Sequence, residues 1–175
     1  MLMLTDFYTA FSPACFSLLA LWLAIITLNA PAWLNLPEGD AAARSPESQR
    51  QLTIRQRQAY IVALYFAAPG TMSLLALIDL QSTSWWRVFF IIVSVLGVAG
   101  MLWFGPFPNR QPHHLLDVSD QVVHWIAIGL YLAIAVLALP ALHALRIEGV
   151  LLTVLVLLGV HVALRLMFAT GVNKK

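Results

Sequence analysis

The chain has 175 residues, of which 61% are hydrophobic and 10% charged, and its formal net charge is +2. Soluble domains carry about 25% charged residues, and a chain this short could not hide so much apolar surface from water. These values exclude an ordinary soluble domain, and so small a net charge does not indicate nucleic-acid binding. The single cysteine, Cys15, excludes an internal disulfide and a cysteine-based metal site within one chain.

The first apolar segment predicts a transmembrane helix over residues 7–28. This run is too long for the apolar part of a signal peptide, and no Lys or Arg precedes it. We therefore expect it to remain in the mature protein as the first helix of a membrane domain.

A polar stretch over residues 31–58 follows. Its Ser-Pro-Glu sequence at 45–47 is typical of a helix start, because Ser caps, Pro fits the first helical position and Glu favours the first turn. Arg50, Arg55 and Arg57 then lead into the next apolar segment. We expect a short basic helix that lies at the membrane surface and continues into the bilayer. Alternatively, these arginines only set the topology.

The second apolar segment predicts a transmembrane helix over residues 59–80. Pro69 and Gly70 lie near its middle, where they weaken the helical hydrogen bonds and permit a kink. The carbonyl that Pro69 leaves without a donor must then find a partner within the protein. The pair is either a passive bend or a hinge.

The third segment predicts a helix over residues 86–104, joined to the second by a short link that favours a tight antiparallel hairpin. Asp79 and Arg87 lie at the same distance from the middle of this link. They are therefore expected to face each other as an ion pair at the membrane edge, or else to be solvated separately. Gly97 and Gly100 predict a closely packed face on this helix.

The last two apolar segments predict helices over residues 121–144 and 147–168. A few residues around Arg146 join them, so they should form another antiparallel hairpin. Both predicted helices carry ionisable side chains inside apolar runs, which is rare in membrane segments and usually functional.

The polar side chains of this hairpin predict a pathway for an ion or a proton. Asp120, His124 and Tyr131 share one helix face, and His161 and Arg165 lie one turn apart on the next helix. The hairpin places His161 level with Tyr131, so we expect a neutral His161 hydrogen-bonded to Tyr131, within a polar ladder in the inner half of the membrane. Alternatively, Arg165 extends to the surface and His124 is interfacial.

Two other kinds of site have weaker support. His113, His114 and Asp117 could bind a metal, but adjacent histidines in a loop are more often solvated. Paired histidines on neighbouring helices can hold haem, yet His124 and His161 lie at different depths in the predicted hairpin. We therefore expect no metal or cofactor.

Five crossings place the chain ends on opposite sides of the membrane. With the N-terminus outside, the inner side holds Arg44, Arg50, Arg55, Arg57, Arg110, Arg165, Lys174 and Lys175. The outer side holds only Arg87 and Arg146. The positive-inside rule therefore predicts an external N-terminus and a cytoplasmic C-terminus.

The sequence predicts an all-α bundle of five transmembrane helices in one domain, residues 1–175. It has none of the nucleotide-binding, zinc-protease or nucleophile motifs of soluble enzymes, so we expect no enzyme. The first functional hypothesis is an oligomeric ion channel or permease, and the alternative is a non-catalytic subunit, assembly factor or regulator of a larger membrane complex. A haem-binding electron carrier ranks third. The expected partners are the lipid bilayer and copies of this chain or other membrane proteins, with no nucleic acid, and the expected location is a cell membrane such as the bacterial inner membrane.

Overall fold

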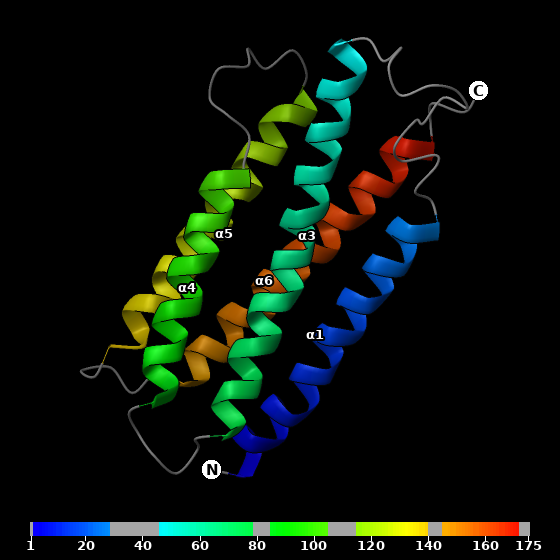
Figure 1. Cartoon of the computed structure of the whole chain (residues 1–175). Coiled ribbons are helices and arrows are strands. Elements are labelled where there is room, and N and C mark those ends of the chain that lie inside the picture. The colour runs from blue at the N-terminus through cyan, green and yellow to red at the C-terminus, as the bar shows by residue number, and fades with distance from the viewer. Residues whose placement is uncertain (1, 29–45, 79–84, 105–114, 140–144, 172–175) are drawn as a thin grey trace.

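The computed structural model describes residues 2–28, 46–78, 85–104, 115–139 and 145–171 (Figure 1). Throughout these ranges the backbone is helical apart from a turn after α5, and they contain no strand. The helices are α1 (Leu2–Leu28), α3 (Pro46–Ile78), α4 (Trp85–Phe104), α5 (Leu115–Leu137) and α6 (Leu145–Gly171). The prediction of an all-α bundle of five helices is confirmed.

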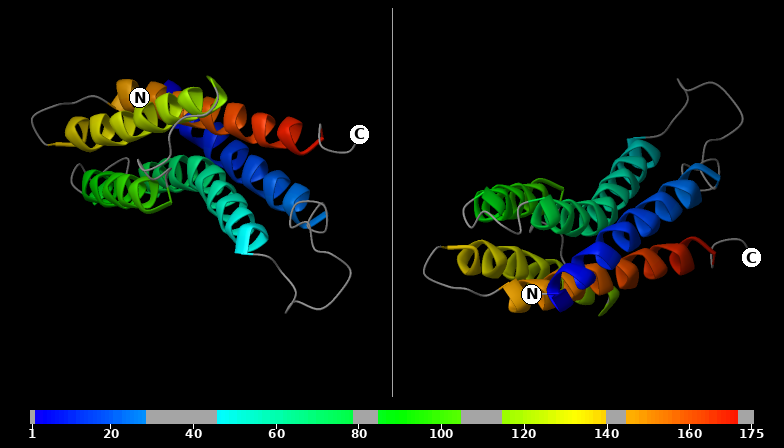
Figure 2. Two further views of the ribbon diagram at one scale, coloured as in Figure 1. Left: turned by 90° about the horizontal axis from the view of Figure 1, so that it is seen from above. Right: turned by 90° about the horizontal axis from the view of Figure 1, so that it is seen from below.

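Successive helices run in opposite directions, so the two ends of the chain lie at opposite ends of the bundle (Figure 1). Seen along the bundle, α5 and α6 lie on one side, α3 and α4 lie on the other, and α1 packs along α3 (Figure 2). The contacts of α3 with α1, α4 and α6 are together more extensive than those of any other helix, so α3 is the central helix.

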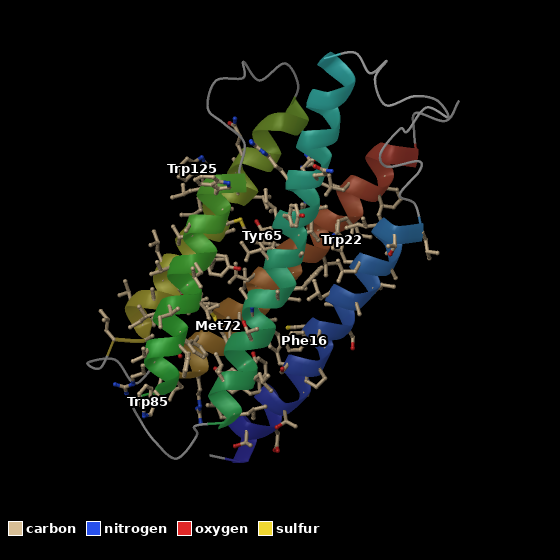
Figure 3. The ribbon with its side chains drawn as sticks, in the orientation of Figure 1. Phe16, Trp22, Tyr65, Met72, Trp85 and Trp125 are labelled. Atoms are coloured by element: carbon tan, nitrogen blue, oxygen red, sulfur yellow. The ribbon has the colours of Figure 1, made fainter. Side chains whose placement is uncertain are left out.

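Four helices contain segments that are long and apolar enough to cross a membrane. These segments are Leu4–Leu28, Gln56–Leu77, Trp85–Trp103 and Arg146–Phe168. Exposed tryptophans mark both ends of the bundle, with Trp85 at the lower end and Trp125 at the upper end in Figure 3. Tryptophan is enriched at membrane–water interfaces, so this placement agrees with helices that cross a bilayer.

The α5 helix differs from the predicted span over residues 121–144, because it begins at Leu115 and ends at Leu137. Pro140 explains the early end, since a proline disfavours helical geometry in the residue before it. The chain closes the helix with a tighter turn, in which the Leu139 amide donates to the Val136 carbonyl at 3.1 Å. The apolar part, Gln121–Leu137, is about 25 Å long against about 30 Å for a bilayer core.

The basic segment before the second span is helical and continues into that span, as expected, and its position at a membrane surface stays a prediction. Residues 46–78 form one continuous helix of 33 residues, about 50 Å long. This exceeds the thickness of a bilayer core, so the polar first turns of α3 extend beyond its apolar segment, Gln56–Leu77. The helix start indicated by the Ser-Pro-Glu sequence is confirmed, since α3 begins at Pro46, whereas hydropathy marks only the apolar segment.

The α3 helix bends along its length (Figure 2) and contains Pro69 and Gly70, both buried, in its C-terminal third. Two neighbouring helices donate hydrogen bonds to carbonyls beside this point. The Tyr131 hydroxyl of α5 donates to the Leu64 carbonyl at 3.3 Å, and the Ser12 hydroxyl of α1 donates to the Gly70 carbonyl at 3.2 Å. Carbonyls on both sides of Pro69 therefore accept hydrogen bonds from neighbouring helices. Hinge motion at this point remains a prediction.

Glycines on α4 and α6 bring these helices close to their neighbours. A Cβ atom on Gly97 would lie 2.7 Å from the Tyr131 ring, and one on Gly100 would lie 2.9 Å from a side chain of α3. A Cβ on Gly159 would lie 2.6 Å from the Cβ of Tyr65. The predicted close-packed face of Gly97 and Gly100 is confirmed, and Gly159 provides a second one on α6.

The indole of Trp22 supplies a third hydrogen bond onto α3. Trp22 lies between α1 and α3 (Figure 3), is 2% exposed, and donates from Nε1 to the Ala59 carbonyl at 3.2 Å. Like Ser12 and Tyr131, it binds a main-chain oxygen of the central helix. Aromatic packing and main-chain hydrogen bonds thus fix α1 and α5 against α3.

Candidate ion-binding site

The most unusual polar residue in the described part of the chain is Glu148, in the first turns of α6. Its side chain is fully buried at 0% exposure. Helical spacing places it on the same face as Leu152, Leu155 and Gly159, which packs against α3. Glu148 therefore points into the bundle and away from the surface.

Both carboxylate oxygens of Glu148 are buried and have no hydrogen-bond partner among the described residues. More than nine in ten buried polar groups in proteins have one. A carboxylate without partners is especially costly in an apolar interior, because it gives up hydration and gains nothing. Glu148 thus needs a proton, water or an ion to satisfy it.

The first turns of α1 cover Glu148. Phe7 packs against α6 so closely that a Cβ on Gly149 would lie 3.1 Å from the Phe7 ring. Next to it, Tyr8 is 0% exposed and lies within electrostatic range of Glu148. The absence of a side chain at Gly149 lets α1 lie close against this end of α6, beside the buried carboxylate.

The α4 helix contributes a positive charge. Arg87 is half-buried, stacks over the Trp86 ring at 5.3 Å, and lies within electrostatic range of Glu148. Its Nε atom is buried and also has no hydrogen-bond partner among the described residues. The two opposite charges are therefore near each other without direct hydrogen bonding. Water, which both donates and accepts, could bridge them.

Three helices therefore form one polar cluster at the end of the bundle where the chain begins. We call Tyr8 of α1, Arg87 of α4 and Glu148 of α6 the Glu148 cluster. Among the described residues, no three His, Cys, Asp or Glu side chains gather as a metal site would require. The Glu148 cluster can hold water and accept a proton or a small ion, and its one carboxylate cannot alone enclose a metal ion.

The structure gives different environments to the residues of the predicted ladder. His124 is buried at 8% exposure beside Trp125, and Tyr131 is fully buried. Both belong to the interior, as a pathway would require. Asp120 lies in α5, but its side chain is outside the described residues, as are those of the proposed metal ligands His113, His114 and Asp117.

His161 is exposed, which differs from the expected contact with Tyr131. The reason is the register of α6: His161 lies two residues after Gly159, which is about 200° around the helix, so the two face opposite directions. Gly159 faces α3, and the Tyr131 hydroxyl donates to Leu64. Arg165 is half-buried and has an interaction partner within the protein. The expected His161–Tyr131 bond is thus wrong, and the roles of His161 and Arg165 in a pathway remain predictions.

The predicted Asp79–Arg87 ion pair cannot be compared with the structure, because Asp79 lies outside the described residues. The described neighbours of Arg87 are Trp86 and Glu148. Sequence reasoning missed Glu148 because it follows Arg146 closely and resembles a charge at a helix end. The available signal was its register, since it continues the buried face of α6 towards Gly159.

Comparisons with protein-family models, with curated proteins and with solved structures gave no match for this chain. The functional argument therefore depends on the chemistry of the Glu148 cluster and on the membrane character of the helices.

Proposed function

We propose that the protein is a small ion channel or permease and that Glu148 is its ion-binding residue. The observation that supports this proposal is a fully buried carboxylate, without hydrogen-bond partners among the described residues, near one end of an apolar span. Ionisable residues in such segments are costly, and they usually mark ion pathways or proton relays. A carboxylate in the first turn of α6 gains from the helix dipole, but an exposed carboxylate would gain as much, so the dipole does not explain why Glu148 is buried.

The other interior polar groups extend from the Glu148 cluster towards the opposite end of the bundle. Tyr131 is buried near the middle of α5, and His124 lies seven residues before it, about 10 Å nearer the end where the chain terminates. We propose a route from Glu148 past Tyr131 to His124. With the N-terminus external, as the distribution of Lys and Arg predicts, Glu148 lies in the outer half of a cell membrane and His124 in the inner half.

Flux in liposomes tests the proposal. The purified chain is reconstituted, and ion movement is followed after an imposed gradient, for the wild type and for Glu148→Gln. The amide keeps the size of the side chain and removes its charge and its ability to exchange a proton. We expect flux to fall at least tenfold. Asp6→Asn is the matched control, because Asp6 is an exposed carboxylate near the same end of the bundle. Equal flux in wild type and Glu148→Gln would refute the proposal.

A second candidate function is supported by His161. This imidazole is exposed on α6 between apolar side chains, where a lipid chain could offer it no hydrogen bond. A partner helix could offer one, so the chain could instead be a subunit of a larger membrane complex. Mass measurement in mild detergent separates the cases. A homo-oligomer supports the channel or permease, whereas a stoichiometric second protein that His161→Leu releases supports the subunit.

A further inference from the structure

We propose that the ion bound by Glu148 is a proton and that the Glu148 cluster excludes metal cations and halides. This inference rests on the proposed function and identifies its substrate. The first reason is the number of ligands. Metal cations such as Mg²⁺ and Ca²⁺ need six or more oxygen ligands, whereas a proton needs one carboxylate oxygen. Glu148 is the only carboxylate of the cluster, and no metal-binding group of three occurs in the described part of the chain.

The second reason is charge. Arg87 is within electrostatic range of Glu148, so a metal cation entering the cluster would meet a guanidinium. A halide would meet the ionised Glu148 in the same way. Arg87 also opposes protonation, but a proton offsets this by forming a covalent bond to a carboxylate oxygen, whose negative charge it neutralises, whereas a metal cation or a halide forms no such bond.

The transfer itself is simple. A hydronium ion gives its proton to one Oε atom of Glu148 and leaves as water, and the reverse step returns the proton to water on the other side. Water between Arg87 and Glu148 would supply the missing hydrogen bonds in both states, since the three unpartnered atoms are two acceptors and one donor. Tyr8, which is buried beside Glu148, limits access from the α1 side.

Within the described ranges, few charged and titratable groups surround Glu148. Helix α1 contributes Tyr8, and α4 contributes Arg87. On α6 itself, Arg146 is exposed, two residues earlier. The described titratable residues of α5, His124 and Tyr131, lie nearer the opposite end of the bundle, as do Arg57, Tyr60 and Tyr65 of α3. Arg87 is therefore the charge on which the proton affinity of Glu148 should depend most.

The experiment measures flux with a pH-sensitive dye inside liposomes, and with Na⁺, K⁺ and Cl⁻ replaced in turn by impermeant ions. We expect the same proton flux in every buffer. Flux should fall at least tenfold in Glu148→Gln and remain measurable in Glu148→Asp, which keeps a carboxyl group. Arg87→Gln removes a positive charge that opposes protonation, so the pH of half-maximal flux should rise by about 1 unit or more.

The possible outcomes separate the inference from the proposed function. Flux that depends on Glu148 but stops when Na⁺, K⁺ or Cl⁻ is replaced would overturn the proton inference and leave the ion permease standing. Proton flux that persists in Glu148→Gln would also overturn it. If Glu148→Gln leaves the flux of every ion unchanged, or if the wild type carries none, both proposals are refuted. Elution of each variant at the wild-type volume, with wild-type helicity, shows that it is folded.

Discussion

Replacing Gly159 with alanine should destabilise the bundle by forcing α6 away from α3. The new Cβ would lie 2.6 Å from the Cβ of Tyr65 and 3.0 Å from the Phe66 ring, whereas ordinary contact begins at 3.4 Å. The Cβ of Tyr65 is attached directly to the backbone of α3 and cannot rotate away. The helices must therefore separate by roughly 1 Å, which weakens their packing along the whole contact.

The expected cost follows from two opposing effects. Overpacking a well-packed interior costs about 1–3 kcal/mol, while alanine is better than glycine inside a helix by about 1 kcal/mol. Gly129→Ala isolates the second effect, because nothing lies within 4 Å of a Cβ at Gly129 on α5. Gly159→Ala should therefore be less stable than Gly129→Ala by about 1–3 kcal/mol.

Titration with sodium dodecyl sulfate in mixed micelles measures this difference, with unfolding followed by helicity and by tryptophan fluorescence. Trp22 is a suitable reporter, since it is 2% exposed and packs between α1 and α3. Equal stability of the two alanine variants would refute the close approach of α3 and α6 at Gly159.

Three further predictions use the same measurements or simple reporters. Tyr131→Phe removes the hydrogen bond to the Leu64 carbonyl and should cost about 0.5–1.5 kcal/mol, whereas no loss would mean that this bond contributes nothing. Arg87→Leu and Glu148→Leu should be non-additive in a double-mutant cycle, by about 0.5–3 kcal/mol, and additive changes in stability would show that the two charges are uncoupled. A reporter fused after Lys175 should be cytoplasmic and one placed before Asp6 external, and finding both on one side would contradict an odd number of crossings.

The number and order of the helices could be predicted from the sequence, because about 20 consecutive apolar residues can cross a bilayer only as a helix. Their ends could be predicted only in part. The Ser-Pro-Glu sequence indicated the start of α3 at Pro46, whereas hydropathy marks only the part of a helix that lies in lipid and does not show the polar turns before Gln56. The early end of α5 was not predicted, although Pro140 could have indicated it, since a helix seldom continues to the residue before a proline.

The candidate site was predicted only in part. His124 and Tyr131 were expected to belong to a pathway, and both are buried, but the predicted partner of Tyr131 was wrong. Matching residues by depth in a hairpin ignores the rotation of each helix about its axis. Packing at Gly159 sets that rotation for α6, and it directs His161 outward and Glu148 inward. On α6, Gly159 therefore indicates the buried face, whereas His161 does not.

The hydrogen bonds from Ser12, Trp22 and Tyr131 all end on main-chain oxygens of α3. A substitution on α3 that preserves the helix cannot delete such an acceptor, because every residue type supplies the same carbonyl. The donors have no such freedom, since each depends on one hydroxyl or indole. Homologous chains could therefore vary at Ala59 and Leu64 within the limits of side-chain volume, while their positions equivalent to the three donors would be restricted to residues that can donate.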